Sequence, residues 1–151
     1  MTPPEFRLKD FDAVKSEIER LRAGGHVRRG NWDFAQVCDH LTYFIDASLD
    51  GAKFRVPWLI KVLFGRMALK RTLATRRIKP GSPTPHQLPP PGGDESAAAE
   101  RLTRAIERLQ AHAGAFHPSP FFGAMTREQC LEMHLIHCNH HLGMLTAKVS
   151  L

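Results

Sequence analysis

The stretch from Thr126 to Leu142 reads T-R-E-Q-C-L-E-M-H-L-I-H-C-N-H-H-L. Thr126 with Gln129 three residues later is a capping-box pattern, which predicts a helix that begins at Thr126 and runs almost to the C-terminus. Three further helical patterns precede it, and no alternating run of apolar and polar residues indicates a strand. The sequence therefore predicts an all-α fold, a four-helix bundle.

The three earlier helices are marked by caps and by apolar residues at three- and four-residue spacing. Gly24 and Gly25 end the first helix, and the third begins at residues 94–96. A capping box of Asp33 and Gln36 starts the second, which runs to Asp50. The buried stripe of the first is Phe11, Val14, Ile18 and Leu21, and that of the third is Leu102, Ile106, Leu109 and Ala113.

A long connection joins the second helix to the third. Val56 to Thr75 is apolar enough to form a further helix, which we expect to pack on the bundle. Pro80 to Gly93 contains six prolines and is expected to be extended or turning, because proline lacks a backbone donor and restricts the residue before it. This connection would let the chain cross the bundle.

Length and composition favour one domain spanning residues 1–151. A chain of 17.0 kDa with 42% hydrophobic and 24% charged residues is neither disordered nor fibrous. Three cysteines do not form a disulfide framework and suit a reducing compartment. No signal-peptide pattern opens the sequence and no apolar run is long enough to span a bilayer, so a cytoplasmic location is expected.

The net charge of +6 is concentrated in one segment. From Lys53 to Pro91 there are nine Lys or Arg and no Asp or Glu, whereas the rest of the chain is net acidic. No recognition motif and no interleaved aromatic residues accompany these bases, so we expect no sequence-specific nucleic-acid partner. The bases of the helix that follows Pro57 do not gather on one polar face, so no membrane partner is expected either. These bases are Lys61, Arg66, Lys70 and Arg71.

Histidines concentrate in the last helix, where four of the nine fall within eight residues. His137 and His141 are one helical turn apart and can offer two imidazole nitrogens to one metal ion. His134 lies on the same face. A third ligand should come from another helix, and His40 is the candidate because it sits among apolar residues two turns into the second helix. The alternative is that these are ordinary core or surface histidines.

A family resemblance adds to this interpretation. Trp32 before a helix with His40 eight residues on, and His137 and His141 in a late helix, resemble the DinB/YfiT-like metalloenzyme superfamily, specifically a DinB-like subfamily of unknown function. The resemblance continues through short segments elsewhere in the chain. These are Leu49 to Gly51, Pro57 to Leu59, Pro89 to Gly92, Phe122 to Gly123 and His134 to Leu142.

The resemblance implies an up-down-down-up bundle with a divalent metal held by His40, His137 and His141. Three imidazoles favour zinc, with nickel as a second choice. Many relatives have H-R-G-Q after the last histidine, where this chain has His141, Leu142, Gly143 and Met144. His134 is then a catalytic candidate, either as a general base or as a hydrogen-bond donor to a ligand, with a fourth-ligand role also open.

Function remains open among three classes at this stage. Relatives include transferases that use a low-molecular-weight thiol, which predicts metal-assisted attack by a thiolate on a small-molecule substrate. The alternatives are a metal-dependent hydrolase with His134 as base and a non-catalytic bundle that binds a ligand or partner. Tyr43 and Phe44, one turn beyond His40, are candidate walls of a substrate pocket. The three cysteines are expected to be packing residues. Because dimers occur in the superfamily, we also expect a homodimer.

Overall fold

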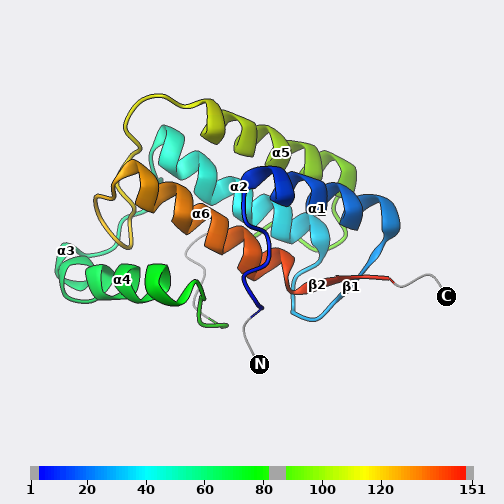
Figure 1. Ribbon diagram of the computed structural model, residues 1–151, viewed down its shortest axis with the longest axis horizontal. Coiled ribbons are helices and arrows are strands. Elements are labelled where there is room, and N and C mark those ends of the chain that lie inside the picture. Colours follow the sequence, from blue (N-terminus) through cyan, green and yellow to red (C-terminus); the bar gives the residue numbers. More distant parts are fainter. Residues whose placement is uncertain (1–3, 82–87, 149–151) are drawn as a thin grey trace.

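A computed structural model describes residues 4–81 and 88–148, so part of the proline-rich stretch lies outside the described residues. The described chain is mostly helical with one small sheet (Figure 1). The longer helices are α1 (Phe11–Gly24), α2 (Phe34–Asp50), α5 (Glu95–Ala111) and α6 (Arg127–Leu142). Between α2 and α5, the short helix α3 (Trp58–Ile60), the π-helical turn η1 (Lys61–Gly65) and α4 (Arg66–Thr75) follow one another without interruption.

The predicted helix starts are confirmed. Asp33 and Gln36 form a reciprocal capping box at α2, and Thr126 and Gln129 form the same motif at α6. Each box satisfies two backbone donors that a helix start would otherwise leave without a partner, which fixes where the helix begins. Asp33 has a second task, because its other carboxylate oxygen accepts a bond of 2.7 Å from the backbone N–H of Gly92. The start of α2 is thereby joined to the end of the proline-rich connection.

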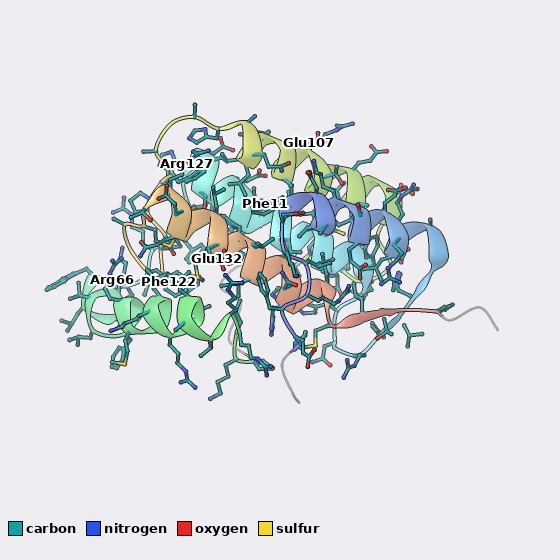
Figure 2. All side chains as sticks on the ribbon, in the orientation of Figure 1. Phe11, Arg66, Glu107, Phe122, Arg127 and Glu132 are labelled. Atoms are coloured by element: carbon teal, nitrogen blue, oxygen red, sulfur yellow. The ribbon has the colours of Figure 1, made fainter. Side chains whose placement is uncertain are left out.

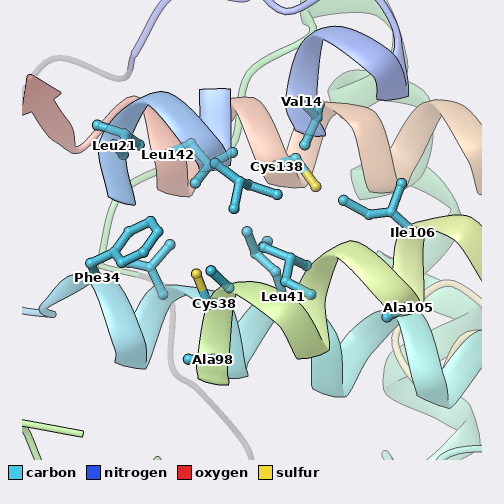
Figure 3. Packing of buried hydrophobic residues seen from close by; sticks show 14 of the residues in the cluster. Val14, Leu21, Phe34, Cys38, Leu41, Ala98, Ala105, Ile106, Cys138 and Leu142 are labelled. Atoms are coloured by element: carbon cyan, nitrogen blue, oxygen red, sulfur yellow. The ribbon is translucent and has the colours of Figure 1, made fainter. Parts of the chain in front are cut away.

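One hydrophobic core is shared by α1, α2, α5 and α6. Both α1 and α2 pack against α5 and α6, and Figure 3 shows Val14, Leu41, Ile106 and Leu142 meeting from these four helices. These side chains are almost fully buried. Burial of an aliphatic side chain of this size contributes about 1.5–3 kcal/mol, so the shared core holds the helices together.

Three details of the sequence prediction were wrong. The last helix does not run almost to the C-terminus but ends at Leu142, and a strand β2 (Leu145–Ala147) follows it. This strand pairs antiparallel with β1 (His26–Arg28), Val27 opposite Thr146, in a two-stranded sheet that the sequence did not predict. Ala113 lies beyond the end of α5 and is exposed, because α5 stops at Ala111.

The segment from Trp58 to Thr75 is helical as predicted, but most of its apolar side chains do not pack on the other helices. It contacts the rest of the protein through buried Gly65 and Leu69, and α4 lies beside α6. Large apolar residues between 58 and 67 are instead exposed. Within the described residues, no helix has the length and apolar character needed to cross a bilayer.

Gly65 is required where this segment meets the loop after α5. A Cβ atom at residue 65 would overlap the carbonyl oxygen of Phe121, and a backbone atom cannot move aside as a flexible side chain can. Gly65→Ala is therefore expected to lower the free energy of unfolding by about 1–3 kcal/mol or to detach the segment from the loop. Urea unfolding combined with limited proteolysis measures both outcomes.

Gly24→Ala is the matched control for this prediction, because a Cβ atom at residue 24 meets nothing within 4 Å. It should cause no loss of stability, since alanine favours a helix more than glycine does. Equal stability of the Gly65→Ala variant and the wild type, with equal resistance to protease, would show that the close approach is unimportant.

Candidate metal centre

Three histidines from two helices converge in the structure. His40 of α2 and the pair His137 and His141 of α6 each offer a ring nitrogen, and these three atoms all lie within 4.8 Å of one another. The Nε2 atoms of His40 and His137 are 3.0 Å apart. We call these three residues the histidine cluster. Among the described residues, it is the one group of His, Cys, Asp and Glu side chains with such spacing.

Local sequence explains why these side chains meet. His137 and His141 are four residues apart in one helix, so their rings stand one turn above the other with centroids 4.7 Å apart. His40 lies seven residues after the cap of α2, on the side that packs against α6. Its ring lies 4.9 Å from that of His137 and 4.5 Å from that of His141.

The donor set fits a divalent first-row metal. Imidazole nitrogens bind zinc at about 2.0–2.1 Å in a tetrahedral arrangement, which places two ligand nitrogens about 3.3 Å apart. The separation of 3.0 Å between His40 and His137 is close to that value, and the third nitrogen lies within reach. The three histidines could therefore hold a metal ion with little movement of their side chains.

Two histidines of the cluster are also in the protonation state that metal binding needs. Burial, together with the neighbouring histidines, holds the pKa of His137 well below its usual range. The pKa of His141 is lowered in the same way, by burial first and then by His40 and His140. Both imidazoles are thus neutral at neutral pH, and a neutral imidazole keeps the lone pair that a metal accepts.

Aromatic rings surround the cluster. Trp32 stacks on His141 at 5.1 Å between ring centroids and lies 4.7 Å from His40. Phe44 meets His40 and His137 edge-on, at 5.0 Å and 5.3 Å. In the sequence, Trp32 stands out only as part of a family pattern. Its place at the site has no local signal, because a residue before a helix start has no periodicity that reveals which way it points.

Tyr43 contacts aromatic rings next to the cluster. Its ring stacks on that of Phe54 and meets that of Phe44, with centroids 6.3 Å and 5.4 Å apart. Phe54 and Phe121 also contact each other, so aromatic contacts continue from the cluster towards the chain that precedes α3. Phe44 borders the cluster directly, and a role of Tyr43 and Phe44 in a substrate pocket stays a prediction.

His134 points to a different partner. Its Nε2 atom lies 2.7 Å from the hydroxyl oxygen of Ser48, and the thiol of Cys130 approaches the same hydroxyl at 3.7 Å. Burial lowers the pKa of His134 to about 4, so its ring is neutral at neutral pH. The group of converging ligand atoms does not include His134. The pairing with Ser48 had no signal in the sequence, and a catalytic role of His134 stays a prediction.

The cysteines are free and buried, as expected for packing residues. Cys38 and Cys138 belong to the hydrophobic core. Burial raises the pKa of the Cys138 thiol to about 12, so it is not a thiolate at neutral pH and does not act as a metal ligand in that form. His140 is buried beside His141, and its Nδ1 atom has no hydrogen-bond partner among the described residues.

A surface hollow lies away from the histidine cluster. It has a volume of about 610 Å³ and is formed between α4 and the start of α6. No histidine lines it. The candidate site is therefore the group of converging ring nitrogens and not this hollow. The lining residues are Arg66, Leu69, Lys70, Leu73, Ala74 and Gln129.

Fold and site together define a mostly helical protein with a three-histidine cluster suited to a metal ion. Residues 1–148 match the model of a family described as "Protein of unknown function (DUF1569)". Because this match covers nearly the whole chain, the protein belongs to the DUF1569 family. No curated protein matches the chain, and no solved structure matches it.

Proposed function

We propose that this protein is a metal-dependent enzyme whose divalent ion is held by His40, His137 and His141. The observation that carries the proposal is the convergence of three ring nitrogens within 4.8 Å from helices α2 and α6. Imidazole ligands suit zinc best, with nickel as the second choice, whereas magnesium and calcium prefer oxygen. Three protein ligands leave positions for a substrate or thiol, as in catalytic rather than structural zinc sites.

We further propose that the fold is a DinB/YfiT-like four-helix bundle with up-down-down-up order. Two observations support this. The core is shared by α1, α2, α5 and α6, and the long connection between α2 and α5 gives the chain room to cross from one end of the helices to the other. The histidines occupy the positions that the resemblance assigns to metal ligands.

The reaction we favour is transfer of a low-molecular-weight thiol to a small electrophile. A divalent ion at this site would lower the pKa of a thiol bound to it. The thiol proton passes to solvent, a sulfur–carbon bond forms, and the bond from that carbon to the leaving group breaks, the leaving group departing with the electron pair. The rings of Trp32 and Phe44, which contact the histidines, are apolar and would limit the access of water to the nucleophile.

The residue types in the histidine cluster favour this reaction over hydrolysis. Among the described residues, the group of converging ligand atoms contains no carboxylate that could serve as a base for an attacking water. His134 is the remaining candidate base, but its Nε2 atom is engaged with Ser48. A thiol that has lost its proton to solvent needs no further base in order to attack the electrophile.

Thiol turnover tests this proposal. Protein loaded with zinc should consume a thiol from a panel of low-molecular-weight thiols in the presence of an activated aryl halide, and the rate should exceed that of metal-free protein. The His137→Ala variant is expected to show only the metal-free rate. The exposed His117 offers a matched control, since His117→Ala should keep full activity.

Cobalt substitution gives a second readout that does not depend on turnover. Addition of the correct thiol should change the visible spectrum of cobalt-loaded protein, since sulfur would enter the metal's coordination sphere. If no thiol changes the spectrum and none turns over, the transferase reaction is wrong, and the non-catalytic binding protein becomes the better explanation. Ester or amide hydrolysis that is lost in His134→Gln would instead establish the hydrolase.

A further inference from the structure

A cluster of large apolar side chains projects into solvent from α3, η1 and the start of α4. Trp58 is 71% exposed, Phe64 62% and Met67 67%. We call the whole set the apolar tip. Exposing so many neighbouring apolar side chains to water is unfavourable. A large exposed apolar patch of this kind is typical of an interaction surface. Its members are Trp58, Leu59, Ile60, Val62, Leu63, Phe64 and Met67.

The apolar tip is held in place by the rest of the protein. Gly65 is buried against the backbone of Phe121, and the guanidinium of Arg66 donates to the carbonyl oxygens of Phe122 and Ala124. Figure 2 shows Arg66 and Phe122 at this junction. In Figure 1, α3 lies at one end of the long axis of the molecule, with the small sheet towards the other. The tip is therefore presented outward on an anchored support.

Positive charge surrounds the apolar tip along the chain. The residues from Lys53 to Pro91 include nine Lys or Arg and no acid. Along the chain, Lys53 and Arg55 precede the tip, Lys61 and Arg66 lie within its length, and the other five bases follow it. Six of them form neither an ion pair nor a side-chain hydrogen bond with any described residue, namely Lys53, Arg55, Lys61, Lys70, Arg71 and Arg77.

We propose that the apolar tip docks on an anionic lipid surface. Its aliphatic and aromatic side chains would enter the boundary between headgroups and acyl chains, with Trp58 at the interface where tryptophan is favoured. The unpaired cations before, within and after the tip would meet the lipid phosphates, each strengthening binding about fivefold. The segment is too short to cross a bilayer and would lie on its surface.

Charge argues against the other occupants of this surface. In a symmetric dimer the same patch faces itself, so the unpaired bases around one tip would meet those around the other. A nucleic acid would match the bases but would leave Leu59, Ile60 and Leu63 in water, because recognition of single strands relies on aromatic stacking. An anionic bilayer satisfies both the apolar and the cationic part of the surface.

Vesicle sedimentation tests the proposal with the full chain. The protein should pellet with vesicles of phosphatidylcholine mixed with phosphatidylglycerol and much less with phosphatidylcholine alone. The double variant Ile60→Ser with Leu63→Ser should bind at least about tenfold more weakly. It should fold normally, because the two side chains are already 50% and 55% exposed. In a Trp32→Phe background, the emission of Trp58 should shift to the blue on binding.

Matched variants separate the apolar from the charged contribution. Val27 is an equally exposed apolar residue at 53% on β1, so Val27→Ser should leave binding unchanged. Lys70→Gln with Arg71→Gln should weaken binding to anionic vesicles roughly thirtyfold, whereas the exposed pair Arg28→Gln with Arg29→Gln should have little effect.

Three results would overturn the proposal. The first is equal sedimentation of wild type and the Ile60→Ser, Leu63→Ser variant. The second is a wild-type dimer that this variant converts to a monomer without any vesicle binding, since the tip would then be a subunit interface. The third is binding to single-stranded RNA but not to anionic vesicles. Metal binding at the histidine cluster would be unaffected by the Ile60→Ser, Leu63→Ser variant, so this test is independent of the proposed function.

Discussion

The His137→Ala variant is expected to lose nearly all of the metal that the wild-type protein carries. Untagged protein purified without chelator should contain about one divalent first-row ion per chain, because three converging imidazoles could form a single site. Loss of an outer partner of a ligand already costs 10–100-fold in affinity, so loss of a ligand should cost at least about 100-fold. Elemental analysis and isothermal titration with zinc measure both quantities.

The same loss is expected for His141→Ala and His40→Ala, whereas His117→Ala should keep full occupancy. Trp32 provides an independent signal, because its ring stacks on His141 at 5.1 Å. In a Trp58→Phe background, cobalt or nickel should quench the emission of Trp32, and the quenching should disappear with the ligand. Full occupancy in His40→Ala would remove α2 from the site, and full occupancy in all three variants would refute the metal centre.

Metal-free protein is expected to lose stability steeply as the pH falls below about 6.5. In the unfolded chain a histidine takes up a proton near pH 6.5, but burial lowers the pKa of His134 to about 4 in the folded state. Between these two values the unfolded state binds the proton and the folded state does not, so acid favours unfolding. His134 alone should cost about 3 kcal/mol over this range.

His137, His140 and His141 also have lowered pKa values because of burial, so their effects add to that of His134. Each can contribute a slope of up to about 1.4 kcal/mol per pH unit, and a typical domain has only about 5–15 kcal/mol in total. Urea unfolding from pH 7 to pH 5 isolates the histidines, because the carboxyl groups titrate mainly below that range. Above pH 7 the histidine contribution should be constant.

His134→Gln is the informative variant for this prediction. A glutamine can still reach the hydroxyl of Ser48 but takes up no proton, so the loss of stability between pH 6.5 and 4 should be smaller by about 3 kcal/mol. Saturating zinc should also oppose acid unfolding, since it binds the folded state. Stability that stays constant between pH 6.5 and 5 would mean that these histidines are protonated in the folded protein.

The helices could be predicted from the sequence because their signals are local. The capping boxes at Asp33 and Thr126 and the apolar stripe of α1 lie within a few residues of the positions they define. The strands β1 and β2 had no such signal, because three residues are too short for an alternating pattern to be visible. Their pairing depends on a turn of the chain that only the packed helices bring about.

At the site, too, residues with a local signal could be predicted and contacts between distant residues could not. His137 and His141 were found from their spacing in one helix, and His40 from its apolar neighbours. The stacking of Trp32 on His141 and the contact of Ser48 with His134 join residues more than 80 positions apart, so no local pattern reports them. The exposure of the apolar tip was missed for the opposite reason, because an apolar helix predicts burial but cannot specify what covers it.

The distance along the chain between His40 and His137 also sets the order in which the protein can assemble during synthesis. The two residues are 97 positions apart. At about 5–20 residues per second, the ribosome needs about 5–20 s to add this stretch. In that time α1, α2 and α5 can already pack on one another. The side of α2 that carries His40 has no packing partner until α6 has been synthesised. Docking of α6 is thus the step that completes the core and the histidine cluster together, and the finished chain, not the nascent one, is the species that can take up an ion.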